Sequence, residues 1–294
     1  MPEGNTIHRF ARRHARDLAG RKVRVSSPQG RFAAEAKRLD RRRFLGAEAY
    51  GKHLFHLWQG GLVVHVHLGM AGDFYRFEGK APAPRATVRM RLSVPGITTD
   101  LIGPPTCKLI SEEERRAIEA RLGPDPLRSD ADPERVWTEL RRRSRPIGDA
   151  LLDQRVISGV GNIYRNEALF LAGIHPLRPS NRLTREEWRA LWETITRLMR
   201  MGLREGRVAT VDRREKPHER SGRSARDAFY VYRRENCRRC GGAIREFSLT
   251  GRRMWACPTC QRRRGGSGMP LAPRLARSHG HGRDARDPDR AHSR

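Results

Sequence analysis

The stretch Ala86-Thr-Val-Arg-Met-Arg-Leu-Ser-Val94 decides the fold class of the N-terminal half of this 294-residue chain. Apolar side chains stand at every second position, and threonine, arginine or serine fills the positions between them. Because successive side chains of a β-strand point to opposite faces, this period predicts a strand with one face on a core and a basic face outward.

Strand patterns also lie on the N-terminal side of this stretch. Residues 50–58 and 62–68 are apolar runs separated by Gln59-Gly60-Gly61, which is typical of a β-hairpin. Residues 5–19 have apolar positions three or four apart and predict an amphipathic helix that ends at Gly20. Several short strands with no helices between them predict an antiparallel sandwich or barrel.

The second half of the chain has helical spacing instead. Gly123-Pro-Asp-Pro126 has the composition of a linker, and Thr184-Arg-Glu-Glu187 is a capping box that opens a long helix. The expected helices are one that starts at Ser111, and those over residues 133–143, 146–154, 162–172 and 184–204. The polar residues 206–228 predict a mobile loop, and the α+β class follows from the change of pattern.

The charge of the chain points to a polyanion as its partner. Lys and Arg number 61 against 33 Asp and Glu, which gives a formal net charge of +28. Nucleic acid is the usual partner of such a protein, although charge alone does not choose between DNA, RNA and acidic lipid. Residues 265–294 lack apolar periodicity and predict a disordered basic tail, either a solvated extension or an auxiliary DNA-binding arm.

The sequence also bears on the compartment. No apolar stretch approaches the ~20 residues of a bilayer span, so we expect no integral membrane protein. The first ten residues lack the apolar core of a signal peptide, which predicts a cytoplasmic protein, associated with the nucleoid if its partner is DNA.

Four of the five cysteines follow the spacing Cys237-x2-Cys240-x16-Cys257-x2-Cys260. Two such pairs can present four sulfurs to one tetrahedral ion, which predicts one structural Zn²⁺ on a C-terminal β-hairpin. Two disulfides or two redox-active pairs are the alternatives, and a cytosolic chain disfavours the disulfides. The fifth, Cys107, is expected to be a small buried side chain.

Short motifs in chain order resemble the formamidopyrimidine-DNA glycosylase/endonuclease VIII family. These motifs span nearly the whole chain without its tail, and together they are far more specific than any one alone. They are Met1-Pro-Glu-Gly4, Gly51-Lys52, His67-Leu-Gly-Met70, Asp153-Gln154, Gly159-Val-Gly-Asn-Ile-Tyr164 with Glu167, and Gly251-Arg252 before the second cysteine pair.

The resemblance implies a domain organisation with damaged duplex DNA in a cleft between the parts. It implies an N-terminal antiparallel β-sandwich catalytic domain over residues 1–118 and a helix–two-turn–helix DNA-binding domain over 124–228. A zinc-finger hairpin over 229–264 and the tail over 265–294 would follow. We expect the protein to act as a monomer.

The resemblance assigns the chemistry to Pro2 and Glu3. Once Met1 is removed, Pro2 carries an α-amino group, which titrates near ~7.7–8.0 and is therefore partly unprotonated at neutral pH. Attack on the deoxyribose C1′ would expel the base and leave an iminium, and β,δ-elimination would then cleave the strand. Glu3 is the expected proton shuttle, which protonates the sugar ring oxygen as the bond breaks.

The remaining site residues would contact DNA. Lys52 is expected to contact phosphate and assist base loss, and Met70 is expected to fill the space left by the flipped base. Asn162, with Tyr164 nearby, is expected to bind phosphate beside the glycines that precede it, at the start of a helix. Arg252 and the neighbouring Arg253 on the hairpin would grip phosphates that flank the lesion.

Two departures from the family pattern bear on the substrate. Members that remove oxidised purines usually carry an Arg-x-Phe pair before the linker, and residues 100–109 contain none. Gly4-Asn5-Thr6 replaces the acidic continuation that those members share. Both differences favour the endonuclease VIII branch, and hence oxidised pyrimidines such as thymine glycol. His65 and His67 share a strand face, but we expect no metal there because the sequence spaces no third ligand to join them.

The activity that the resemblance predicts is that of a bifunctional DNA glycosylase and abasic-site lyase of base excision repair. The alternative is a non-catalytic zinc-containing DNA- or RNA-binding protein. A glycosylase-like fold without catalysis is a third reading, and the presence of Pro2 and Glu3 argues against it.

Overall fold

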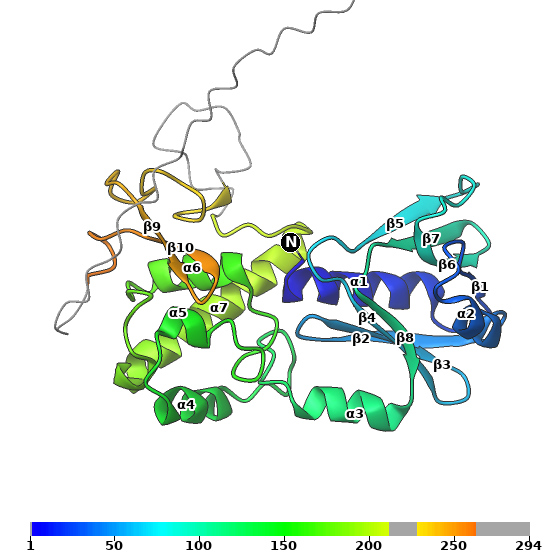
Figure 1. Cartoon of the computed structure of the whole chain (residues 1–294), viewed down its shortest axis with the longest axis horizontal. Coiled ribbons are helices and arrows are strands. Elements are labelled where there is room, and N and C mark those ends of the chain that lie inside the picture. Colours follow the sequence, from blue (N-terminus) through cyan, green and yellow to red (C-terminus); the bar gives the residue numbers. More distant parts are fainter. Residues whose placement is uncertain (1, 212–227, 263–294) are drawn as a thin grey trace, which may run out of the picture.

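The computed structural model describes residues 2–211 and 228–262. Its N-terminal half contains two four-stranded antiparallel sheets that share one apolar core (Figure 1). The first sheet has the order β1 (Arg24–Ser26), β6 (Val88–Val94), β7 (Ile97–Ile102) and β5 (Asp73–Glu78). The second has the order β2 (Phe44–Tyr50), β3 (His53–Trp58), β4 (Leu62–His67) and β8 (Thr106–Ile110). The predicted antiparallel sandwich is confirmed.

The alternation that decided the fold class is visible in the burial of β6. Val88, Met90, Leu92 and Val94 are buried, and the residues between them are half-buried. The outward arginines are not equivalent, because Arg91 donates two hydrogen bonds of 2.7 Å to the Asp100 carboxylate on β7. Arg91 is therefore neutralised within the sheet, whereas Arg89 donates to the uncharged side chain of Gln29.

Helix α1 (Gly4–Leu18) runs through the core of the sandwich, and the short helix α2 (Ala33–Leu39) covers one end (Figure 1). Ile7, Phe10 and Leu18 of α1 pack into the apolar cluster. His14 is buried there too, with its Nδ1 2.9 Å from Nε2 of His56 on β3. Burial holds the pKa of His56 at about 3 and lowers that of His14 well below its usual range, so both imidazoles are neutral.

The helical half follows the expected order. Its helices are α3 (Glu112–Ala120), α4 (Pro133–Arg142), α5 (Ile147–Ala150), α6 (Asn162–Leu171) and α7 (Arg185–Glu205), with a 3₁₀ turn at Ser180–Arg182. The capping boxes predicted at Ser111 and Thr184 are both present. Among the helices of the described residues, none combines the length and the apolar character needed to cross a bilayer.

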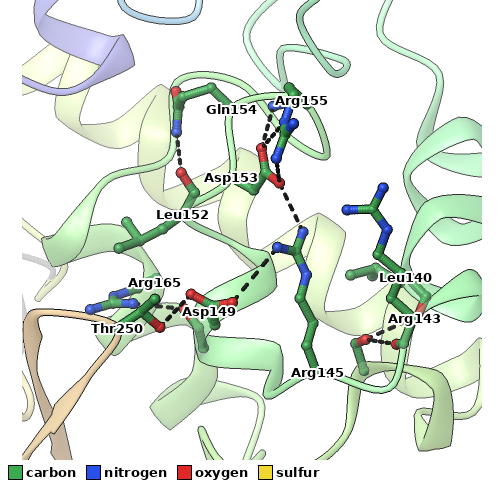
Figure 2. Close-up of polar contacts among 12 residues, drawn as sticks. Leu140, Arg143, Arg145, Asp149, Leu152, Asp153, Gln154, Arg155, Arg165 and Thr250 are labelled. Atoms are coloured by element: carbon green, nitrogen blue, oxygen red, sulfur yellow. Dashed lines mark hydrogen bonds and ion pairs between the residues drawn. The ribbon is translucent and has the colours of Figure 1, made fainter.

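The helix expected over residues 146–154 is wrong in length, since α5 ends after one turn at Ala150. The Asp153 carboxylate accepts a hydrogen bond from the backbone N–H of Arg155 and pairs with the side chains of Arg145 and Arg155 (Figure 2). This local bonding stabilises a turn, which competes with continuation of the helix.

The C-terminal hairpin of β9 (Arg245–Leu249) and β10 (Arg252–Ala256) packs on α6. Met254 joins the core of the helical half, and the backbone N–H of Trp255 donates to Asn166 on α6 at 2.8 Å. The predicted loop over 206–228 lies largely, and the tail over 265–294 wholly, outside the described residues.

Candidate active site

Glu3 lies where the two halves of the molecule meet. It directly precedes α1, but its side chain reaches the beginning of α6 and accepts hydrogen bonds from Gly161 N at 2.9 Å and Ile163 N at 2.8 Å. The first N–H groups of a helix have no partner within the helix, and the helix dipole favours an anion there. The carboxylate of Glu3 is therefore the N-terminal cap of α6, held across the junction.

This position corrects the expectation that the glycines before Asn162 receive a phosphate. The amides of Gly161 and Ile163 are occupied by Glu3, whose side chain is fully buried. The glycines instead admit the N-terminal segment. A Cβ on Gly161 would lie 2.4 Å from Cδ of Glu3, and a Cβ on Gly4 would lie 2.8 Å from Cα of Gly159. Gly4 N also donates to Gly159 O at 2.9 Å.

Burial and charge act on Glu3 in opposite directions. Burial raises its pKa, while Lys52 and the amides of α6 stabilise the charged form. Burial lowers the pKa of Lys52, Glu3 opposes that shift, and the cations Arg252 and Arg165 add to it. These two shifts bring the pKa of the Glu3 carboxyl and the pKa of the Lys52 amine closer together than they are in water.

Lys52 sits in the turn between β2 and β3. Its Nζ donates to Val160 O at 2.8 Å. The next residue, Gly161, is the one whose backbone N–H donates to Glu3. Gly51 precedes it with a φ of +57°, and a Cβ there would lie 2.8 Å from Cβ of Ser158. A glycine is needed because the backbone is left-handed and the turn packs tightly against residues 158–160.

Asn162 begins α6 and is oriented by Arg165. Arg165 is fully buried. Its Nε donates to Oδ1 of Asn162 at 2.9 Å, and its Nη1 donates to Gly148 O at 2.8 Å. Because Oδ1 accepts from Arg165, Nδ2 of Asn162 points to the C-terminal hairpin and donates to Arg253 O at 3.2 Å. The geometry leaves Asn162 as a hydrogen-bond donor at the junction of α6 and the hairpin.

Met70 and Arg252 lie together on the surface. Met70 is one of the few large apolar side chains that are exposed among residues 2–211 and 228–262, at 68%. Nη1 of Arg252, at the hairpin, lies 3.8 Å from its Sδ. Arg253 is also exposed and pairs with Glu246 on the facing strand at 3.1 Å. An exposed apolar side chain next to exposed cations fits the expected wedge beside bound phosphate.

The expected DNA contact of Tyr164 is not supported by its position. Its side chain is fully buried, and its hydroxyl packs so close to α7 that a Cβ on Gly202 would lie 2.1 Å from it. The residue anchors α6 on α7 and offers DNA no exposed group. Pro2 directly precedes Glu3 in the chain and is half-buried.

Two buried carboxylates have structural roles that the sequence did not predict, Asp125 at this junction and Glu167 on α6. Oδ2 of Asp125, in the linker, accepts from Nε2 of His8 on α1 and from the backbone N–H of Gly51, both at 2.7 Å. Glu167 on α6 accepts from the N–H groups of Tyr230, Val231 and Tyr232. Asp125 thus fixes the turn that carries Lys52, and Glu167 fixes the segment that leads to the hairpin.

The four predicted cysteines converge, with all four Sγ atoms within 4.8 Å of one another. Sγ of Cys237 is 3.9 Å from that of Cys260, and Sγ of Cys240 is 3.5 Å from that of Cys257. A tetrahedron with ~2.3 Å metal–sulfur bonds has edges of about 3.8 Å. The donor set fits a tetrahedral metal ion and leaves no position for a substrate.

The sheet also brings a third histidine to His65 and His67. Nδ1 of His53 on β3 lies 2.8 Å from Nε2 of His65 on β4, and His53 stands directly opposite His67 in the register. Burial lowers the pKa of His53 to about 3 and that of His65 to about 4, so the pair shares one hydrogen bond as neutral imidazoles. Cys107 is buried in the sandwich core, as expected.

Comparison with known proteins agrees with this geometry. The N-terminal domain of formamidopyrimidine-DNA glycosylase matches residues 1–103, and the H2TH domain of the same proteins matches residues 122–213. The chain is 49% identical to Endonuclease 8 1 of Mycobacterium tuberculosis over 271 residues, which is 89% of this chain and all of that protein. The chain belongs to the formamidopyrimidine-DNA glycosylase family.

Two further relatives extend the comparison. The chain is 34% identical to a probable endonuclease 8 2 of Streptomyces coelicolor, over 89% of this chain and 94% of that protein. The structure of Lactococcus lactis Fpg in complex with DNA that contains an abasic site superposes with a TM-score of 0.74 at 22% identity. It covers 89% of this chain and all of that one. This likeness confirms the fold.

Proposed function

We propose that this chain is a bifunctional DNA glycosylase and abasic-site lyase that excises oxidised bases from damaged duplex DNA in base excision repair. The observation that carries the proposal is the Glu3 carboxyl, buried on the N-terminus of α6 and adjoining both Pro2 and Lys52. The family membership and the Endonuclease 8 relatives support it.

The proposed reaction begins at the Pro2 amine after removal of Met1. The nitrogen lone pair attacks C1′ of the damaged nucleotide, the C1′–base bond breaks, and the bonding pair leaves with the base, which takes up the N–H proton released from the Pro2 nitrogen. Glu3 protonates the ring oxygen O4′ as the sugar opens, and the Pro2 nitrogen becomes an iminium. Because burial raises the pKa of Glu3, the carboxyl group can hold this proton before it passes to O4′.

The iminium then withdraws electrons from the sugar. Loss of the C2′ proton breaks the bond to the 3′ phosphate, and loss of the C4′ proton breaks the bond to the 5′ phosphate. Lys52, Asn162, Arg252 and Arg253 would hold phosphates beside the lesion while Met70 fills the gap. The expected product is a gap in the damaged strand with a phosphate at each end.

We infer that the metal of the four-cysteine site is Zn²⁺ and that its role is structural. Four thiolates in tetrahedral arrangement favour zinc, and they position the hairpin that carries Arg252. The proposed substrate would place a monomeric enzyme on the chromosome, in the cytoplasm at the nucleoid.

We propose oxidised pyrimidines as the preferred lesions. The connection between β7 and β8 is Gly103-Pro-Pro105, which offers no arginine or aromatic side chain for a second wedge. The identity to an Endonuclease 8 supports the same choice.

The proposal is tested by Glu3→Gln. The variant keeps the shape of the side chain but cannot donate or accept the proton, so removal of thymine glycol from duplex DNA should fall at least ~100-fold. Cleavage of a preformed abasic site, which needs no base departure, should fall by less than about tenfold. Equal loss of both activities would contradict the assigned role, and binding of damaged duplex without any scission by the parent protein would favour a non-catalytic binder.

A further inference from the structure

A groove of about 430 Å³ opens beside the exposed Met70 and is not used by the reaction described above. One wall is formed by Gln29, Arg31 and Arg89. The other is formed by Met70 with Ala71 and by the turn over residues 103–105. None of these lining residues is acidic, so the groove combines an apolar side with a cationic side.

The cationic wall is held in place by its own hydrogen bonds. The backbone N–H of Gln29 donates to Val88 O at 2.9 Å, and Ser27 Oγ donates to Arg89 O at 2.7 Å. The Gln29 side chain accepts from Nε of Arg89 at 2.5 Å, while Arg31 is exposed. The Arg89 guanidinium therefore projects from β6 itself, and that of Arg31 projects from the segment that is fixed to β6.

The apolar wall is equally fixed. The Met70 turn is closed by a hydrogen bond from Gly72 N to Leu68 O at 2.8 Å. It rests on Pro105, since a Cβ on Gly69 would lie 2.7 Å from Cγ of Pro105. The turn between β7 and β8 carries no long side chain, so it leaves the groove open.

We propose that this groove binds the phosphodiester backbone of the DNA strand opposite the lesion, through Arg31 and Arg89. Met70 separates the groove from Arg252, which is placed to bind the damaged strand. A wedge that enters the duplex has one strand on each side, so the cations beyond Met70 face the other strand. Guanidinium groups bind phosphate strongly, and their charge matches that occupant.

The proposal rests on the proposed function, and its test is a binding measurement that needs no catalysis. A fluorescent duplex with a tetrahydrofuran abasic analogue is compared with the same labelled strand alone, by anisotropy. Arg31→Ala and Arg89→Ala should each weaken duplex binding five- to tenfold and leave single-strand binding within twofold. The slope of log affinity against log salt should fall by ~0.9 for each lost phosphate contact.

Arg116→Ala is the matched control, because it removes the same charge from an exposed position on α3, away from the groove. It should change duplex binding less than twofold, and the thermal transitions of all variants should match the parent. Unchanged duplex binding in both groove variants, or an equal loss on duplex and single strand, would overturn the proposal. Absence of strand cleavage by the parent protein would instead refute the proposed function.

Discussion

Substitution of Gly161 tests the junction between Glu3 and α6 at its narrowest point. In Gly161→Ala the added Cβ would lie 2.4 Å from Cδ of Glu3 and 2.7 Å from its Cγ and Oε1. Ordinary contacts of this kind begin at 3.4 Å, so the carboxyl must retreat by about 1 Å. A misplacement of ~1 Å in a catalytic group can cost about 100-fold in rate.

The retreat also weakens the two short hydrogen bonds that Glu3 accepts from Gly161 and Ile163. Each such bond to a charged group contributes ~1.5–3 kcal/mol, and partial loss should lower the free energy of unfolding by about 1–2 kcal/mol. We therefore expect a protein that is less stable but folded, with a large defect in base removal.

The assay is single-turnover excision of thymine glycol from duplex DNA, with the thermal transition recorded in parallel. Gly46→Ala on β2 is the control, since a Cβ there has no atom within 4 Å and the backbone is not left-handed. We expect a loss of about 100-fold for Gly161→Ala and less than twofold for Gly46→Ala. Excision by Gly161→Ala within twofold of the parent, with Glu3 still required, would refute the assigned contact.

The remaining predictions concern the metal and the buried histidines. Removal of the metal by a strong chelator should release one zinc ion per chain and weaken duplex binding at least tenfold, because the hairpin that carries Arg252 loses its support. Added Zn²⁺ should restore duplex binding. Full duplex affinity after quantitative release of the metal would contradict its structural role. His56 is neutral in the folded state with a pKa of about 3, so only the unfolded state takes up its proton as the pH falls below ~6.5. Stability from this group is therefore complete above pH 6.5 and falls by about 1.4 kcal/mol for each unit toward pH 3. Denaturant unfolding should show no slope from His56 above pH 6.5 and this slope, added to those of the other buried histidines, between pH 6 and 5. His56→Gln should reduce the slope between pH 6 and 5 by about one proton, and an unchanged slope would mean that His56 does not titrate on unfolding.

Local patterns were sufficient for most of the fold. The alternation in residues 86–94 reports one buried face, and the capping boxes at Ser111 and Thr184 satisfy amides within three residues of themselves. The cysteine spacing is likewise a local pattern, because the two cysteines of each pair lie in one turn, and this brings their sulfurs to the same side. These features depend on neighbours along the chain, so the sequence displays them.

The site depends on contacts that no local pattern displays. Gly161 and Glu3 are 158 positions apart. The glycines were therefore predicted to bind phosphate, because no residue near them in the sequence indicates that the Glu3 carboxylate binds there. Asp125 is 117 positions from His8 and lies in a segment that reads as a linker. Tyr164 was expected to contact DNA, but its side chain is buried against α7. The residue types were predictable, whereas their partners followed from the docking of the two halves.

The most direct test of the account is the identity of the nucleophile. The protein is incubated with an abasic duplex and sodium borohydride, which reduces an iminium to a stable amine, and the cross-linked peptide is located by mass spectrometry. The account predicts one adduct on the peptide that begins with Pro2, and no adduct in a protein that retains Met1. An adduct on Lys52, or trapping that persists when Met1 is retained, would contradict it.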